Sequence, residues 1–186
     1  MERFFRKRFG TAETVAVVVG ILVMVFLDHC VFNYANGTAK EILNYVKILW
    51  LIIMAVIFGS YTGVIIGVAG TILTQYFAPQ LYWFVSAFAL GIYGYIIGSY
   101  SDKYEIRTGF FRLKQAMFLE FVMLFANILV FIFMNPLVKF ITAKSVLLDE
   151  MRSGVSYAPY LSVCTILFVC PICYVVNLIH RKIIKK

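Results

Sequence analysis

Charged residues are scarce in this chain of 186 residues, where Asp, Glu, Lys and Arg together make up 14%. Hydrophobic residues make up 62%, and the mean hydropathy is +0.90. Soluble domains carry about 25% charged and about 45–50% apolar residues. The shortage of charge therefore excludes a water-soluble globule or a disordered chain, and it indicates a polytopic membrane protein. Six spans of about 20 residues would take about 120 residues, so we expect residues 1–186 to form a single membrane domain without a separate soluble part.

Motifs that carry catalysis are also missing. The sequence has no glycine-rich phosphate loop, no HExxH, no GxSxG and no DxD-like acidic cluster for a metal. His29 and His180 are predicted at opposite membrane faces, so they cannot share a metal ion. We therefore expect no enzyme activity, no cofactor and no resident metal. Energy for uphill transport would have to come from a partner or from an ion gradient.

The four cysteines give one redox-like pattern, Cys170-Pro171-Ile172-Cys173. This CxxC spacing is similar to that of membrane thiol oxidoreductases of the vitamin K epoxide reductase type. However, Cys170 would lie about 16 Å deep in a predicted helix, at 1.5 Å per residue, where a thiolate is disfavoured. No second cysteine pair is present to relay electrons. A helix kink at Pro171 is the preferred interpretation.

Long apolar runs predict an all-α membrane protein, because only helices and closed barrels satisfy backbone hydrogen bonds in lipid. Phe58-Gly59-Ser60 interrupts one long run and is predicted to form a tight turn between two helices. The first run is too long for a cleavable signal peptide, so we expect a retained helix. The six-helix bundle is predicted at residues 11–32, 44–58, 60–77, 82–100, 113–135 and 159–180.

Basic residues give the bundle an orientation, because they are retained on the cytoplasmic side. This explains the net charge of +8 better than nucleic-acid binding does. With six spans, three groups of four cations fall on the side of both termini: Arg3, Arg6, Lys7 and Arg8; Lys103, Arg107, Arg112 and Lys114; and Arg181, Lys182, Lys185 and Lys186. The other side receives Lys40, Lys47, Lys139, Lys144 and Arg152. Both termini are therefore predicted to be cytoplasmic.

Two outer loops are predicted to be unequal in length. Residues 33–43 form the polar first loop, and residues 136–158 form the longest loop, which begins at Pro136. Its apolar residues could lie along the membrane surface as a short amphipathic helix. A loop of this length is often a lid or a binding element. The alternative is a connector that rests on the lipid headgroups.

Small residues recur at helical spacing and form flat stripes that let another backbone approach closely. In the two central helices these stripes are best explained by packing inside the bundle; they contain Gly59, Gly63, Gly67 and Gly70, and Ala87, Gly91, Gly94 and Gly98. A third stripe, formed by Ala12, Ala16 and Gly20, begins at the cytoplasmic end of the first helix. This stripe could instead dock a partner protein.

Polar and aromatic residues gather near the predicted outer ends of the helices. Intramembrane polar groups are costly and therefore informative, and aromatic walls with a few polar groups are typical of a small-molecule pocket. The alternative is an interfacial aromatic belt. The candidate binding residues are Asp28, Asn33, Gln75, Trp83, Asn127, Asn135, Tyr157 and Tyr160. Glu13 and Glu120 are predicted nearer the cytoplasm. They could form a proton relay, or they could pair with Lys or Arg or with a partner subunit.

Together these features resemble the substrate-binding S component of energy-coupling factor (ECF) vitamin transporters, and most closely its riboflavin-type group. The length, the six spans and the cytoplasmic ends are the first similarity. Ala12-x-x-x-Ala16 is similar to the family's docking motif, the glycines of residues 58–67 to its glycine-rich turn, and residues 83–98 to its small-residue fourth helix. Glu13 departs from the family pattern because it lies inside the docking stripe.

The resemblance implies a division of labour. An S component binds a vitamin or related micronutrient from outside, and a transmembrane coupling subunit with two ABC ATPases drives its release inward. The protein would be a multi-pass protein of a bacterial cell membrane. By position, the family's pocket falls on Trp83, Asn127, Asn135, Tyr157 and Tyr160, with Asp28, Asn33 and Gln75 as additional candidates. Because few charges face outside, we expect a neutral or weakly charged, partly aromatic ligand.

Two other functions remain open from the sequence. One is a non-transporting membrane scaffold, which would need no outer pocket and would bind no small molecule. The other is a stand-alone secondary carrier, for which internal inverted repeats would be expected. No such repeat of clear quality is present.

Overall fold

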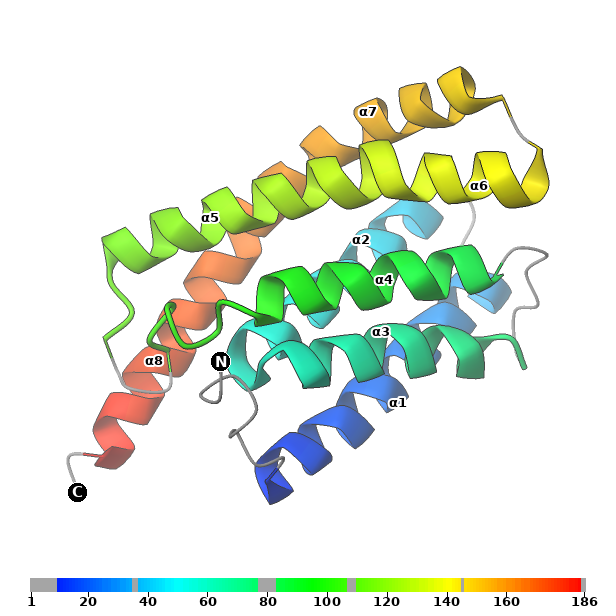
Figure 1. Ribbon diagram of the computed structural model, residues 1–186. Helices are drawn as coiled ribbons and strands as arrows, with labels where there is room; N and C mark the ends of the chain where they lie inside the picture. Colours follow the sequence, from blue (N-terminus) through cyan, green and yellow to red (C-terminus); the bar gives the residue numbers. More distant parts are fainter. Residues whose placement is uncertain (1–9, 35–36, 77–82, 107–109, 145, 185–186) are drawn as a thin grey trace, which may run out of the picture.

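The computed structural model describes residues 10–34, 37–76, 83–106, 110–144 and 146–184, which are helical with short connections and contain no strand. Four helical segments are long and apolar enough to cross a membrane, and two are shorter. The first four helices are α1 (Thr11–Tyr34), α2 (Thr38–Phe58), α3 (Ser60–Thr74) and α4 (Trp83–Gly98). Figure 1 shows that successive helices run back and forth between two ends of the molecule. The all-α prediction is confirmed for the described residues.

Two long, interrupted helices complete the bundle. The first consists of α5 (Leu113–Asn127), the π-helix η2 (Ile128–Met134) and α6 (Asn135–Ala143). The second consists of α7 (Leu147–Cys164), the π-helix η3 (Thr165–Val169) and α8 (Cys170–Ile184). Each π-helix ends two residues before a proline, Pro136 or Pro171. A proline has no N–H and its ring clashes with the carbonyl four residues earlier, so the wider turn lets the helix continue past it.

The expected long loop at 136–158 is wrong. The structure has two helical extensions there, α6, which ends at Ala143, and the first part of α7, which begins at Leu147. Lys144, directly after α6, has a φ of 52°. The last helix therefore begins at Leu147 rather than near residue 159. Pro136 lies at the N-terminal end of α6, a position that tolerates proline. The loop expected at 33–43 is also shorter, because α2 already begins at Thr38.

The tight turn between α2 and α3 is confirmed at Gly59, whose φ of 96° favours glycine. The internal packing role of the central glycine stripes is confirmed as well. A Cβ on Gly63 would lie 2.6 Å from the carbonyl oxygen of Gly94, and one on Gly67 would lie 2.6 Å from that of Leu90. The backbones of α3 and α4 therefore touch, and side chains at these positions would force the helices apart.

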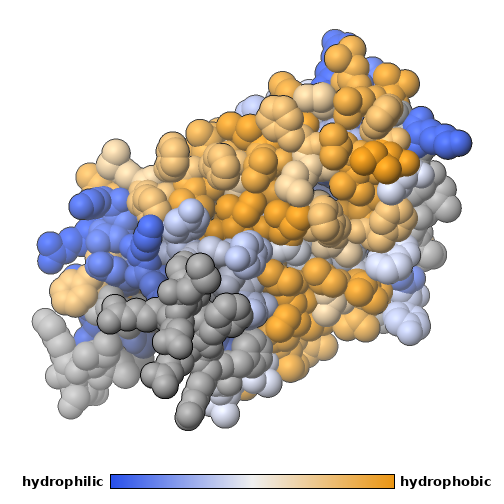
Figure 2. All heavy atoms as spheres, viewed as in Figure 1, coloured by the Kyte–Doolittle hydropathy of each residue, from blue (hydrophilic) through white to orange (hydrophobic). Residues whose placement is uncertain are grey.

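Hydrophilic residues lie at both ends of the molecule and an apolar band lies between them (Figure 2). We call one end the basic end, where α1, α3 and α5 begin and α2, α4 and α8 end (Figure 1). It is named for its described cations Lys103, Arg112, Lys114, Arg181 and Lys182. The opposite end, with the α6–α7 junction, is the hairpin end. The group Arg3, Arg6, Lys7 and Arg8, together with Arg107, Lys185 and Lys186, lies outside the described residues.

Buried polar contacts order the basic end. The hydroxyl of Tyr104 donates a hydrogen bond to the carbonyl oxygen of Ile97 at 3.0 Å, and burial raises the pKa of Tyr104. The side-chain amide of Asn177 in α8 donates to the carbonyl oxygen of Ile106 at 3.1 Å. The first bond holds the residues that follow α4 against α4 itself, and the second holds them against α8.

Candidate functional site

Asn127, the last residue of α5, is the centre of a buried hydrogen-bond chain. Its side chain is fully buried in the apolar part of the bundle, where an unpaired amide would be costly. The hydroxyl of Tyr93 in α4 donates to Asn127 Oδ1 at 2.6 Å, and Asn127 Nδ2 donates to Ser162 Oγ in α7 at 2.9 Å. Ser162 Oγ donates in turn to the carbonyl oxygen of Ala158 at 2.9 Å. This chain joins three helices through one amide.

An aromatic row extends from the same tyrosine. The Tyr93 ring meets Phe131 edge to face with centroids 5.2 Å apart, and Phe131 meets Tyr157 in the same way at 5.4 Å. Tyr157 stacks on Tyr45 of α2 at 4.9 Å with the rings 17° from parallel. The row therefore leads from the fully buried Tyr93 to the half-buried Tyr157 and Tyr45.

We call these residues the polar–aromatic cluster: Tyr45, Tyr93, Asn127, Phe131, Tyr157 and Ser162. Backbone geometry brings its helices together. Gly154 of α7 lies so close to the backbone of Phe131 that a Cβ there would clash with the Phe131 carbonyl oxygen. The missing side chain lets α7 reach η2 and sets Tyr157 against Phe131. None of the six side chains carries a formal charge at neutral pH.

The structure brings only part of the predicted pocket into this cluster. Asn127 and Tyr157 belong to it, whereas the side chain of Tyr160 is 67% exposed. Asn135, the first residue of α6, has a buried Oδ1 without a hydrogen-bond partner within the described residues. Trp83 lies at the start of α4, is partly exposed and contacts Phe84 edge to face.

The remaining predicted residues bond locally or to a charge. Asn33 Nδ2 donates to the carbonyl oxygen of His29 in its own helix, and Gln75 Nε2 donates to that of Thr71. Asp28 forms an ion pair with Lys47 at 2.7 Å, with side chains only 10% and 16% exposed, respectively. This pair joins α1 to α2. Asp28, Asn33 and Gln75 therefore lie outside the polar–aromatic cluster.

Sequence reasoning missed Tyr45, Tyr93, Phe131 and Ser162 as members of the cluster. Tyr93 carries the clearest overlooked signal, since it lies between Gly91 and Gly94 on a closely packed helix. A hydroxyl inside such a surface needs a hydrogen-bond partner. From the sequence, Lys47 is predicted only to contribute to the charge bias, whereas the structure pairs it with Asp28.

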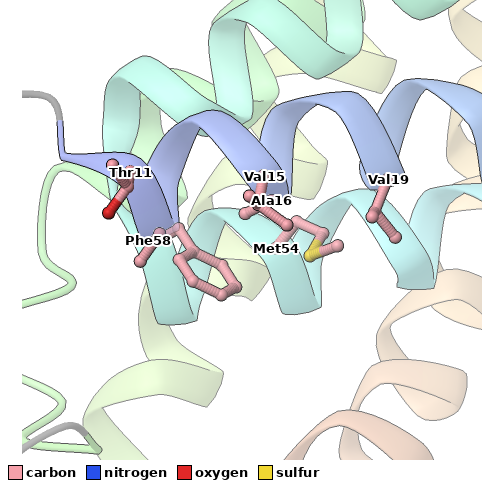
Figure 3. Close-up of a pocket in the computed structure, with 7 residues that line it drawn as sticks. Thr11, Val15, Ala16, Val19, Met54 and Phe58 are labelled. Atoms are coloured by element: carbon pink, nitrogen blue, oxygen red, sulfur yellow. The ribbon is translucent and has the colours of Figure 1, made fainter.

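A second feature is an open apolar groove between α1 and α2 at the basic end, with a volume of about 520 Å³ (Figure 3). Ala12 and Ala16, two of the three predicted docking residues, line it. The third, Gly20, faces α3, where a Cβ would clash with the side chain of Ile66. The complete lining is Thr11, Ala12, Val15, Ala16, Val19, Met54 and Phe58.

The two carboxyls nearer the basic end have separate local partners. Glu13 Oε2 accepts a hydrogen bond from the backbone N–H of Gly10 at 3.1 Å, which satisfies a donor at the start of α1. Glu120 Oε1 accepts a hydrogen bond from the thiol of Cys170 at 2.8 Å. That bond uses the first cysteine of the CxxC pattern as a packing contact between α5 and α8. No group of His, Cys, Asp and Glu in the described residues is arranged to hold a metal ion.

Comparison with known proteins gives a family. Residues 16–153 match the family described as ECF-type riboflavin transporter, S component. A UPF0397 protein of Lactobacillus helveticus is 32% identical over 88 residues, which are 47% of this chain and 48% of the relative. A UPF0397 protein of Phytoplasma australiense is 24% identical over 71% of this chain and 67% of its own length. A UPF0397 protein of Streptococcus pneumoniae is 27% identical over 70% of this chain and 70% of its own length. No solved structure matches.

The aligned part of the chain spans about half the length of the Lactobacillus relative. The family match is longer, and it includes the groove residue Ala16 and the buried amide of Asn127. Apolar helices of membrane-spanning length agree with it. The chain therefore belongs to the ECF-type riboflavin transporter S component family, which consists of multi-pass bacterial membrane transport proteins rather than enzymes.

Proposed function

We propose that this chain is the substrate-binding subunit of an ECF-type importer. It captures a vitamin or related micronutrient from outside and delivers it inward together with a transmembrane coupling subunit and two ABC ATPases. The observation that carries the proposal is the family match over residues 16–153. The polar–aromatic cluster and the apolar groove supply one surface for each of the two tasks.

The polar–aromatic cluster is the proposed ligand site. Tyr157 and Tyr45 are half-buried rings that stack on each other, and the fully buried amide of Asn127 lies in the same cluster. Sites of this kind bind a flat, unsaturated ring by stacking and orient it with a few hydrogen bonds. With no charged member, the cluster favours a neutral or weakly charged ligand. The family's description makes riboflavin the first compound to test.

The groove between α1 and α2 is the proposed docking site for the coupling subunit. Ala12 and Ala16 leave room for another helix to approach closely, and Val15, Met54 and Phe58 give it an apolar surface to contact. The groove lies at the basic end, whereas Tyr45 and Tyr157 of the cluster lie in the parts of α2 and α7 nearer the hairpin end. A docked partner would therefore leave these two rings uncovered.

The proposed orientation places the basic end in the cytoplasm and the hairpin end outside, with six crossings and both termini inside. The full sequence supports this, because six crossings place twelve Lys and Arg residues on the side of the basic end and five on the other side. At 1.5 Å per residue, α3 and α4 are about 22–24 Å long, less than the hydrocarbon thickness of about 30 Å. A local thinning of the bilayer around this pair would accommodate two short crossings.

The proposal is tested by purifying the protein in mild detergent, identifying retained small molecules by mass spectrometry, and titrating riboflavin. We expect one vitamin-like compound at near-stoichiometric amounts and uptake that requires the ATPase module. A protein that retains nothing and binds no vitamin would contradict the proposal and favour a scaffold. Uptake that persists without the ATPases would instead favour a stand-alone carrier.

A further inference from the structure

We infer that Tyr93 and Ser162 are positioning residues for ligand recognition: together they hold the amide of Asn127 so that its free N–H serves a hydrogen-bond acceptor of the ligand. This inference rests on the proposed function and deepens it. Tyr93 and Ser162 lie on α4 and α7, and each bonds to a different atom of the same amide.

The direction of the hydrogen-bond chain is set at its far end. A backbone carbonyl can only accept, so Ser162 must spend its single hydroxyl hydrogen on the carbonyl oxygen of Ala158. Ser162 Oγ then presents a lone pair toward Asn127, and the NH₂ side of the amide must face it. Asn127 Oδ1 consequently faces Tyr93, whose hydroxyl donates to it. The three bonds run in one direction and agree with one amide orientation.

The Tyr93 ring cannot readily release this bond. It is fully buried and its ring packs edge to face on Phe131. Its hydroxyl is therefore held at a fixed point, and the bond to Asn127 Oδ1 is short, at 2.6 Å. An amide held from both sides loses little conformational freedom when it meets a ligand, which is the benefit of a preorganised site.

One donor of the amide remains after these bonds. Asn127 has two N–H groups, and Ser162 takes one. Within the described residues the second N–H has no protein acceptor. Asn127 itself is fully buried, whereas Ser162 and Tyr157 on α7 are half-buried, so a ligand would reach the amide from the α7 side by displacing side chains of the cluster. A ligand reaching Asn127 from there would meet a donor, and a ring nitrogen or carbonyl oxygen would be the matching group.

The test compares Tyr93→Phe with Tyr95→Phe, which makes the same chemical change on a tyrosine of the same helix that is 57% exposed. Each purified variant is titrated with riboflavin, its retained small molecules are quantified by mass spectrometry, and its melting temperature is measured. Loss of a hydrogen bond that leaves a buried acceptor unpaired should weaken binding about tenfold or more. We expect this loss in Tyr93→Phe, and wild-type binding in Tyr95→Phe.

A double-mutant cycle separates positioning from a purely structural role. In an Asn127→Leu background, Tyr93→Phe should cause no further loss of affinity, because the amide that it positions is gone. Equal affinity of Tyr93→Phe and wild type, or a full additional loss in the Asn127→Leu background, would overturn the inference. So would a lower melting temperature with unchanged affinity of the folded protein.

The failures of the two proposals are distinguishable. A wild-type protein that retains no small molecule and binds no riboflavin contradicts the proposed function and this inference together. A wild-type protein that retains a compound other than riboflavin still decides the inference, because the amount of that compound retained by Tyr93→Phe and Tyr95→Phe is compared directly. If the two variants retain it equally, Tyr93 is not a positioning residue.

Discussion

The polar–aromatic cluster and the groove share α2 but differ in construction. Tyr45 of α2 contributes a stacked ring to the cluster, whereas Met54 and Phe58, near the other end of the same helix, line the groove. The cluster is closely packed and joined by hydrogen bonds through Asn127. The groove is open and apolar, and it is lined in part by small residues. Directional polar groups favour recognition of a small molecule, and an open apolar surface favours another helix.

The comparison predicts that the two regions can be disabled separately. The largest expected effect comes from filling the groove with Ala12→Trp. A bulky ring there should stop the coupling subunit from approaching, so uptake should fall to background while riboflavin binding by the purified subunit is retained. The measurement is uptake by cells or proteoliposomes containing the complete transporter, together with a binding titration of the isolated subunit.

Val18→Trp is the matched control for the groove. Val18 is 53% exposed on the same helix but does not line the groove. It should keep both uptake and binding. Normal uptake in Ala12→Trp would show that the groove is not the docking surface.

The second prediction concerns a substitution that disables the cluster. Asn127→Leu removes the amide at similar volume and should weaken ligand binding about tenfold to a hundredfold, because polar partners around it lose their bonds. Binding of the coupling subunit should not change, since the groove is untouched. Isothermal titration and co-purification of the complex measure the two quantities.

Asn33→Leu makes the same substitution at a position outside the cluster. Asn33 is exposed, and within the described residues its side chain donates to the carbonyl oxygen of His29 in its own helix. We expect its ligand affinity to match the wild type. A similar loss in both variants would mean that the cluster does not define the site.

The third prediction concerns stability and compares two ion pairs. Asp28→Asn leaves Lys47 buried without its counter-charge, and breaking a buried pair in this way costs about 3 kcal/mol. Lys139→Met breaks the ion pair between Lys139 and Glu150, whose side chains are 37% and 25% exposed, respectively. Loss of this partly exposed pair should lower the free energy of unfolding by less than about 1 kcal/mol. Thermal unfolding in detergent distinguishes them. Equal destabilisation would show that Asp28 and Lys47 are not held in a dry environment.

The smallest expected effect is that of Tyr160→Phe. Its side chain is largely exposed and is not part of the cluster, although it lies only one turn from Tyr157. Ligand affinity and melting temperature should both stay at wild-type values. A clear loss of affinity would extend the site beyond the cluster, to the outward face of α7.

Hydropathy and glycine spacing were enough to predict the helical fold and the packing of the glycine stripes inside the bundle, because both depend on local composition; that α3 and α4 pack on each other is known from the structure. They failed at residues 136–158, where Pro136 was interpreted as the end of a helix. The π-helix before it absorbs the proline, and no simple residue pattern predicts that turn. Amphipathic residues after it then form α6 rather than a separate surface helix.

For the candidate site, the sequence predicted how deep each residue lies in the membrane, but not which way its side chain points around the helix axis. Tyr157 and Tyr160 lie at similar depth and only about 60° apart around α7, yet one joins the aromatic row and the other is exposed. The partners of Asn127 come from helices 34 and 35 residues away in sequence. Such pairings depend on which helices are neighbours, which only the fold determines.

The central claim is that recognition and docking reside in separate surfaces of one subunit. It is tested most directly by quantifying, in parallel purifications, the small molecule retained by wild type, Ala12→Trp and Asn127→Leu. We predict full retention in wild type and Ala12→Trp and a clear loss in Asn127→Leu. Equal retention in all three proteins, or retention lost in Ala12→Trp alone, would contradict the account.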